Sequence, residues 1–326
     1  MSDDAVLKVE NLSIVLSARG RDFPAVNQID FSIKAGEVFG LVGESGCGKS
    51  LCALTIAGLL SAPMKVAQGQ VLLEGQDINR LSNRDLRRLR GDRVAMIFQE
   101  PMTSLNPLMT IGDQIGEMFV LHKGMSARQA RMKAIEALEQ VQVPSPERRI
   151  KDYPHQLSGG MRQRVMIAIA LACDPALLIA DEPTTALDVT IQAEIVELIL
   201  DLCTQRGTAV LMISHDLGLV ARMCDRVAVM YAGHIVEERP ASEIFASPHH
   251  PYTQGLVASL PRLGRRLQEG RTPLTEIKGI VPGLMERDIG CGFASRCTRA
   301  SEECRQIMPS VTSLGDGGSI RCFHHD

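Results

Sequence analysis

The sequence contains no tryptophan, and aromatic residues make up only 3% of its 326 positions. Its 35 basic and 38 acidic residues give a net charge of −3, so no overall basic field would draw the chain onto nucleic acid. The arginine-rich runs NRDLRRLRGDR and PRLGRRLQEGR also lack interleaved aromatic residues that could stack on bases. We therefore expect no nucleic-acid partner.

Long apolar runs are missing as well. The first residues, MSDDAVLKVENLSIVL, carry acids where a secretory signal has bases, and the most apolar stretch, residues 165–180, is interrupted by Asp174 and Pro175. We therefore expect no membrane span and a reducing compartment. Cysteines in such a compartment are core residues, reactive thiols or metal ligands before they are disulfides.

The chain divides into two zones. Apolar, β-branched runs alternate with helical stretches up to about residue 235, which is typical of a sheet packed against helices. From about Pro248 the sequence becomes rich in Pro, Gly and Arg, with little periodicity, and four cysteines follow. We predict an α/β body over residues 1–247 and a small irregular region over 248–326.

A glycine-rich loop is the strongest motif. GEVFGLVGESGCGKSLCALTIAGLL predicts a strand, a loop with the spacing G-x-x-x-x-G-K-[ST], and a helix. Backbone N–H groups of such a loop and the helix N-terminus bind phosphates, Lys49 adds a positive charge, and Ser50 offers a hydroxyl to Mg2+. The predicted nucleotide-binding residues here are Gly43, Glu44, Ser45, Gly46, Cys47, Gly48, Lys49, Ser50 and Leu51.

The run ALLIADEP predicts a buried strand that ends in two carboxylates, Asp181 and Glu182. Parallel α/β sheets bind their ligands at the carboxyl ends of strands. Asp181 is predicted to hold Mg2+ through water, and Glu182 to activate the attacking water as a general base.

Between these two elements lies LSGGMRQR, which resembles the signature of ATP-binding-cassette (ABC) ATPases. The resemblance implies a P-loop core with a β-subdomain and a helical subdomain over about residues 100–165. It also implies roles for Gln99 (Mg2+ and the attacking water), Asp188 (the D-loop), His215 (the γ-phosphate) and Phe23 (under the adenine). In the family, the signature of one subunit closes on the phosphate loop of another, so Ser158, Gly159 and Gly160 would contact ATP held by a second subunit.

The stretches IFQEPMTSLNP, MYAGHIVE and HPYTQGLVASLP are similar to the ATPase subunits of oligopeptide, dipeptide and nickel importers, over about residues 5–326. The resemblance implies an ATPase that drives import from the cytoplasmic face of the inner membrane. Its partners would be two transmembrane permease subunits, a second ATPase that is a paralogue, and, through the permeases, a periplasmic or extracellular solute-binding protein. A nickel importer of the same family, and a soluble ABC ATPase acting on ribosomes or nucleic acid, remain as alternatives.

The four late cysteines, Cys291, Cys297, Cys304 and Cys322, lie in a short region that has little core of its own. Two disulfides, scattered thiols, zinc and an iron–sulfur cluster are the possible interpretations, and four thiolates suit either metal. The gaps contain no C-x-x-C knuckle, and a similar region in the peptide-importer ATPases resembles a [4Fe–4S] site, so we favour that cluster. We expect it to have a structural role, apart from the nucleotide site.

Overall fold

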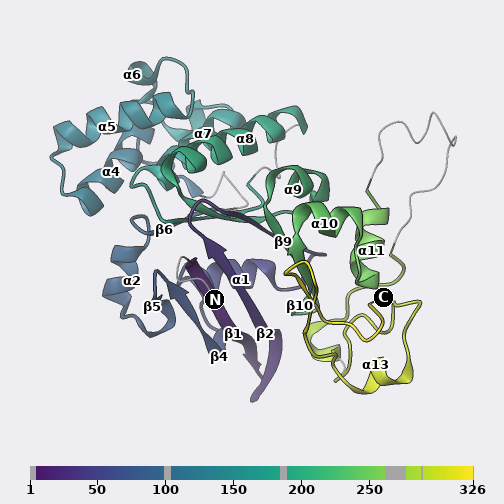
Figure 1. Cartoon of the computed structure of the whole chain (residues 1–326). Helices are drawn as coiled ribbons and strands as arrows, with labels where there is room; N and C mark the ends of the chain where they lie inside the picture. The colour runs from purple at the N-terminus through teal and green to yellow at the C-terminus, as the bar shows by residue number, and fades with distance from the viewer. Residues whose placement is uncertain (1–4, 99–103, 184–188, 261–276, 288, 326) are drawn as a thin grey trace, which may run out of the picture.

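The structure, a computed structural model, describes residues 5–98, 104–183, 189–260, 277–287 and 289–325. Its strands form two sheets, and a layer of helices lies above the larger sheet, on the side away from the smaller one (Figure 1). Within these ranges, we find no helix long and apolar enough to cross a membrane.

The larger sheet has the strand order β11-β12-β10-β9-β3-β8-β7-β6. The strands from β9 to β6 are parallel, whereas β10 pairs antiparallel with β9 and β12. β7 and β8 are buried along their whole length, which explains their continuous apolar sequences. The bounds are β3 Val38–Val42, β6 Val94–Ile97, β7 Leu177–Asp181, β8 Ala209–Ile213, β9 Arg226–Tyr231, β10 His234–Pro240, β11 Thr312–Ser313 and β12 Ser319–Ile320.

The smaller sheet is antiparallel, with the order β2-β1-β4-β5. One apolar core joins it to α1 and to the lower face of the larger sheet, and Leu7, Phe39 and Ile56 are among its fully buried members. The stacked rings of Phe31 and Phe39, with centroids 5.1 Å apart, connect the two sheets. The bounds are β1 Ala5–Ala18, β2 Arg21–Lys34, α1 Lys49–Ile56, β4 Met64–Leu73, β5 Gln76–Asp77, η1 Ile78–Arg80 and α2 Asn83–Leu89.

The helical layer has a second core on the other face of the larger sheet. Four of its described helices, α4, α5, α7 and α9, begin at a residue whose side chain caps the first turn. The Thr110 side chain accepts a hydrogen bond from the N–H of Asp113, and Ser126 forms a reciprocal capping box with Gln129. The bounds are α4 Ile111–Lys123, α5 Ala127–Gln140, α6 Pro146–Arg149, η2 Pro154–Gln156, α7 Gly159–Leu171, α8 Val189–Arg206 and α9 Leu217–Met223.

The C-terminal region lies beside β9 and β10, at the end of the larger sheet opposite β6 (Figure 1). A third core holds it there, in which the rings of Tyr231, Tyr252 and Phe293 meet with centroids 4.5 to 5.4 Å apart. β12 pairs with β10, so the end of the chain belongs to the larger sheet. The bounds are α10 Ala241–Ala246, α11 Pro251–Ala258, η3 Leu284–Glu286 and α13 Glu302–Gln306.

Candidate functional site

The glycine-rich loop joins β3 to α1 and folds around the ammonium group of Lys49. Nζ of Lys49 donates hydrogen bonds to the carbonyl oxygens of Gly43 at 2.7 Å and Glu44 at 3.1 Å, and the residue is buried. α1 begins at Lys49, so the unpaired N–H groups of its first turn lie at the end of the loop. The sequence has thus folded into a cradle for an anion, with a cation inside it.

Two positions in this loop require glycine. Gly43 has φ +151°, and a Cβ atom there would lie 2.1 Å from the carbonyl oxygen of Met230. Gly48 has φ +114°, and its Cβ would lie 2.9 Å from the side chain of Val26. A side chain at either position would strain the backbone and push the loop away from the sheets.

Ser50 and Asp181 meet below the loop. The Ser50 hydroxyl lies 3.4 Å from Oδ1 of Asp181, the last residue of β7. Burial raises the pKa of Asp181, and the charge of Glu182 adds to this, while the hydrogen bond from Ser50 and the charge of Lys49 oppose it. A hydroxyl beside a carboxylate offers the oxygen ligands that Mg2+ prefers.

Glu182 and His215 form a second pair at the same edge of the sheet. Oε2 of Glu182 lies 3.3 Å from Nδ1 of His215, and the Glu182 N–H donates to the carbonyl of Ile213, the last residue of β8. Glu182 has φ +48°, a left-handed conformation that is uncommon for a glutamate and often found at functional sites. The parallel strands β7 and β8 therefore bring a carboxylate and an imidazole together.

A cavity of about 450 Å3 lies beside the loop, a size usual for a small-molecule site. Lys49, Ser50 and Glu182 line it, so the phosphate loop and the proposed base face one space. Cys47, in contrast, is fully buried under the loop. The other predicted residues that line the cavity are Ser45, Gly46, Gly48 and Leu51.

The signature residues lie elsewhere. Ser158 caps α7 by accepting a hydrogen bond from the N–H of Met161 at 3.3 Å, and Ser158 and Gly159 are exposed. Neither they nor Gly160 line the cavity of this chain. α7 nevertheless contacts the segment that carries Glu182, because the buried Gln163 side chain donates a hydrogen bond to the carbonyl of Pro183.

Three further predicted residues remain, of which the structure describes one. Gln99 and Asp188 lie outside the described residues. Phe23 is partly buried on β2, where it pairs with Leu16 of β1, and it is absent from the cavity lining. Ala25 and Met64 line the cavity instead.

Part of the C-terminal region also lines this cavity, through Val281, Pro282, Gly283, Leu284 and Arg287. This differs from our expectation that the region would lie apart from the nucleotide site. The stretch GIVPG carries no binding motif, and only the fold of the region reveals its position.

The four late cysteines line one small cavity, together with His250 and His324 among others. The N–H of Cys291 donates to the carbonyl of Cys304 at 2.8 Å. Burial, with smaller contributions from the other three cysteines, raises the pKa of Cys291 to about 11. Even so, no group of three or more His, Cys, Asp or Glu in the described ranges is arranged to hold a metal ion.

The other five cysteines lie in the α/β body. Cys47, Cys52, Cys173 and Cys203 are buried, and Cys224 is partly buried. Burial raises the pKa of each thiol. These positions suit inert core residues.

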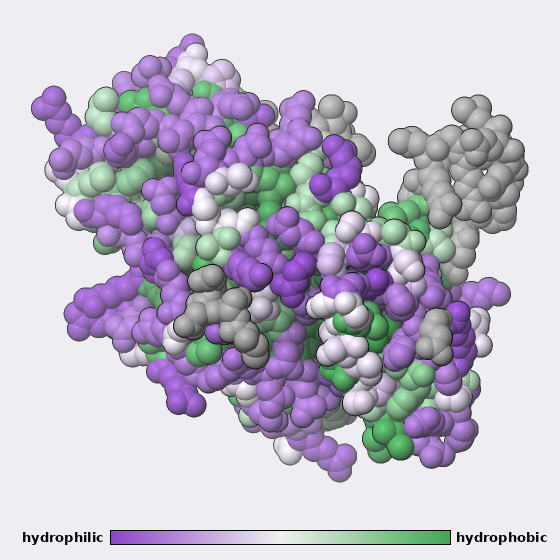
Figure 2. Space-filling model, in the orientation of Figure 1, coloured by the Kyte–Doolittle hydropathy of each residue, from purple (hydrophilic) through white to green (hydrophobic). Residues whose placement is uncertain are grey.

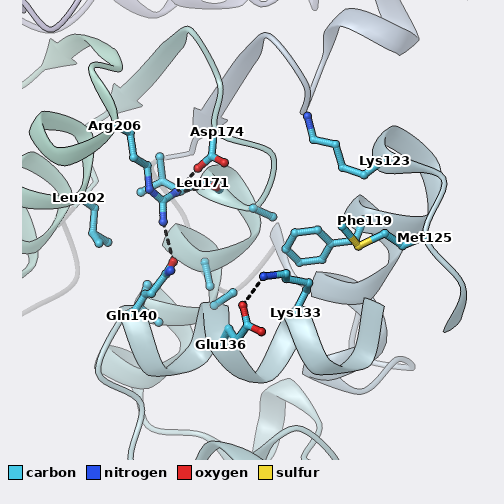
Figure 3. Close-up of a pocket in the computed structure, with 14 residues that line it drawn as sticks. Phe119, Lys123, Met125, Lys133, Glu136, Gln140, Leu171, Asp174, Leu202 and Arg206 are labelled. Atoms are coloured by element: carbon cyan, nitrogen blue, oxygen red, sulfur yellow. Dashed lines mark hydrogen bonds and ion pairs between the residues drawn. The ribbon is translucent and has the colours of Figure 1, made fainter. Parts of the chain in front are cut away.

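Another cavity, of about 270 Å3, lies between α4, α5, α7 and α8 (Figure 3). Its three cations each have an acidic partner: Lys133 with Glu136, Arg206 with Asp174, and Lys123 with Asp92. Because these charges are already paired, the cavity offers no free cation to a ligand. The face of the molecule shown in Figure 2 is mainly hydrophilic, with hydrophobic areas between the polar ones.

Comparison with known proteins agrees with this site. The family model described as ABC transporter matches residues 26–185, and that described as oligopeptide/dipeptide transporter, C-terminal region, matches residues 236–304. The chain is 50% identical to the probable peptide ABC transporter ATP-binding protein y4tR of Sinorhizobium fredii, over 98% of this chain and 95% of that protein. It is 48% identical to the dipeptide transport ATP-binding protein DppD of Escherichia coli, over 98% of this chain and 97% of that protein.

Solved structures show the same fold. A dimeric ATP-binding cassette in a post-hydrolysis state, bound to ADP and Pi, has a TM-score of 0.64 and 29% identity, covering 72% of this chain and 98% of that one. CbiO1 of Clostridium perfringens, part of an ABC transporter complex, has a TM-score of 0.64 and 29% identity, covering 75% of this chain and 92% of its own. These likenesses confirm the predicted α/β fold and ATPase class. The chain belongs to the ATP-binding subunits of ABC transporters, in the oligopeptide/dipeptide branch.

Proposed function

We propose that this chain is the ATP-hydrolysing subunit that drives an inner-membrane importer of di- or oligopeptides. The observation that carries the proposal is Glu182, which lines one cavity with the phosphate-loop residues Lys49 and Ser50 and lies 3.3 Å from His215. The full-length relatives of the chain are peptide-transport ATP-binding proteins. The phosphate loop explains nucleotide binding. The carboxylate explains hydrolysis.

The residues divide the chemistry among them. The loop N–H groups and Lys49 bind the β- and γ-phosphates. Ser50, Asp181 and Gln99 would hold Mg2+, directly or through water, and a bound Mg2+ would supply positive charge to the phosphates. Glu182 takes the proton of the attacking water, and His215, within reach of Glu182, contacts the γ-phosphate.

Two ATPase subunits act together. The signature residues Ser158, Gly159 and Gly160, with Asp188, contact ATP bound in the partner subunit, and the exposed start of α7 supports this. A solved relative of the cassette is dimeric, which also supports it. We propose a heterodimer with a paralogous ATPase.

The complex includes two permease subunits and, on their far side, a solute-binding protein. This chain lies on the cytoplasmic face of the inner membrane and contacts the permeases through its helical layer. Two apolar side chains near the entrance to that layer support such a contact: Phe98 is 40% exposed and Leu108 is 85% exposed.

The four late cysteines hold a [4Fe–4S] cluster, with zinc as the alternative. The support is that all four thiols line one cavity, and thiolate donors suit both groups. A cluster is larger than a single ion, so its ligands stand further apart than those of zinc. The bound group would hold together a region that has only short helices and strands.

Transport by the assembled complex tests the function. This chain, its permeases, the paralogous ATPase and the binding protein are reconstituted in vesicles, and uptake of a labelled dipeptide, a labelled pentapeptide and nickel is measured with ATP. We expect peptide uptake that is lost in Glu182→Gln. Uptake of nickel alone, or co-purification of the chain with ribosomal RNA and no membrane protein, would contradict the proposal.

A further inference from the structure

The cavity beside the phosphate loop has a wall that is distant in sequence. Val281, Pro282, Gly283, Leu284 and Arg287 line the same space as Ser45, Gly46 and Lys49. The fold of the chain therefore brings residues from its two ends to one concave site.

Arg287 supplies a positive charge at the rim of this cavity. Its guanidinium donates hydrogen bonds to the carbonyl oxygens of Pro24 at 3.1 Å and Ala25 at 2.9 Å, and approaches that of Gly46 at 3.4 Å. Its Nε atom is buried without a hydrogen-bond partner. In the described part of the chain, Arg287 forms no ion pair with a carboxylate.

The hydrogen bonds of Arg287 go to neutral carbonyl oxygens, so its charge has no counter-charge among the described residues. Burial lowers the pKa of Arg287, which means that the environment disfavours its charge. A desolvated cation needs an anionic partner to repay the loss of water. Because Gly46 lies in the phosphate loop, an anion held by that loop would be next to Arg287.

The neighbouring residues are of another kind. Val281, Pro282 and Leu284 are apolar and partly buried, and the same cavity is lined by the apolar residues Ala25 and Met64. An apolar compartment beside a cationic one matches a nucleotide, which has a flat base and a charged phosphate chain. Phe23, the aromatic residue predicted for the base, does not line this space.

We propose that the C-terminal region completes the ATP site of its own chain, with residues 281–284 covering the base and Arg287 binding the phosphate chain. The inference rests on the proposed nucleotide role of the loop and adds the residues that fix affinity and base preference. It also makes the C-terminal region part of the binding site.

A second arginine fixes this wall in place. Arg296 donates from Nε to the carbonyl of Lys278 at 2.9 Å and from Nη2 to the carbonyl of Ile277 at 3.1 Å. The same guanidinium pairs with the carboxylate of Glu44 in the phosphate loop. The segment that leads into the wall is therefore tied directly to the loop.

Binding of ATP and of inorganic tripolyphosphate, measured by calorimetry on the full chain with Mg2+, tests the proposal. We expect Arg287→Ala to raise the Kd of both ligands about tenfold, the usual effect of losing one hydrogen bond to a charged group. Leu284→Ser should raise the Kd of ATP about threefold to tenfold and leave tripolyphosphate unchanged, because only ATP has a base. A purely structural defect would not separate the two ligands in this way.

Control variants make the outcomes distinct. Arg305→Ala removes an exposed arginine from the same region and should leave both Kd values unchanged. Lys49→Ala should raise the Kd of both ligands whether or not the C-terminal region takes part in binding. If Arg287→Ala and Leu284→Ser bound ATP like the parent while Lys49→Ala did not, the inference would be wrong and the loop assignment would stand. If the parent chain bound neither ligand, the nucleotide role itself would be overturned. Unfolding temperatures identify any variant that fails to fold. Arg287→Lys keeps the positive charge and should recover part of the affinity that Arg287→Ala loses.

Discussion

Arg296 and Glu44 form a two-point ion pair across 252 residues of sequence. Nη1 of Arg296 lies 2.5 Å from Oε2 of Glu44, and Nη2 lies 3.0 Å from Oε1. The N–H of Glu44 donates to the hydroxyl of Tyr252 at 2.9 Å, a second link from the phosphate loop to the C-terminal region. Since Arg296 precedes Cys297, the pair joins the nucleotide site to the cysteine cavity.

The first prediction concerns this pair. Arg296→Ala should lower the free energy of unfolding by about 1–3 kcal/mol, because the arginine side chain is only 5% exposed while its glutamate partner is 29% exposed. It should also weaken ATP binding several-fold, because the wall at 281–284 loses its tie to the loop. Urea unfolding and calorimetry measure the two effects.

Arg93→Ala is the matched control. Arg93 also pairs with a carboxylate through two nitrogens, to Glu74, but both side chains are more than 40% exposed. Loss of the Arg93 side chain should lower the free energy of unfolding by at most about 1 kcal/mol and leave ATP binding unchanged. Equal losses in the two variants would show that the Arg296 pair has no special role.

The second prediction concerns hydrolysis. Glu182→Gln should leave the Kd of ATP within about twofold and reduce turnover by about a hundredfold or more, because the amide keeps the shape but cannot accept a proton. His215→Gln should also reduce turnover. Phosphate release by the reconstituted complex measures the rate, and a Glu182→Gln complex that hydrolyses at the parent rate would exclude Glu182 as the base.

The phosphate-loop motif can be recognised in the sequence because its residues are local. The loop residues from Gly43 to Ser50 are contiguous, and Asp181 and Glu182 end a run that reads as a buried strand. Glycine at positions 43 and 48 also allows the backbone conformation of the loop, because no side chain fits at either position. The wall was missed because Val281 and Arg287 reach the loop only through long-range packing, which has no local pattern.

The role predicted for Phe23 came from the resemblance and not from a local motif. An aromatic residue upstream of the loop fitted the resemblance, but its neighbours on β1 and β2 decide where its side chain lies. The four cysteines line one cavity, but whether they bind a metal depends on sulfur positions that their spacing in the sequence cannot determine.

The third prediction concerns pH. Burial, together with the charges of Arg321 and Arg287, lowers the pKa of His234 to about 4 from an ordinary 6.5. Below pH 6.5 the imidazole of His234 is protonated in the unfolded chain, whereas in the folded chain it is protonated only below about pH 4. His234 should therefore reduce the free energy of unfolding by roughly 2 kcal/mol between pH 7 and pH 5.

Urea unfolding of the parent and of His234→Gln at pH 7 and pH 5 checks the sign. The variant has no imidazole to protonate, so its stability should fall less on acidification. His122→Gln, a change in the helical layer at a residue that is not buried, serves as the control and should follow the parent. A parent and a His234→Gln variant with the same pH dependence would contradict the prediction.

The last prediction concerns the cysteines. If they hold a [4Fe–4S] cluster, protein purified without air should be brown, absorb broadly near about 400 nm and contain about four iron atoms per chain, whereas zinc would leave it colourless. Serine at Cys291, Cys297, Cys304 or Cys322 should lower the metal content, and serine at the buried Cys173 or Cys203 should not. The sequence alone predicts that such changes spare nucleotide binding. For Cys297 we predict an effect on it, because the guanidinium of the adjacent Arg296 pairs with the carboxylate of Glu44 in the phosphate loop. Cys297→Ser should therefore lose metal and bind ATP several-fold more weakly, while Cys173→Ser does neither.

Full metal occupancy in any two of the four variants would remove the ligand assignment, and metal loss without any change in ATP affinity would show that the two sites are independent.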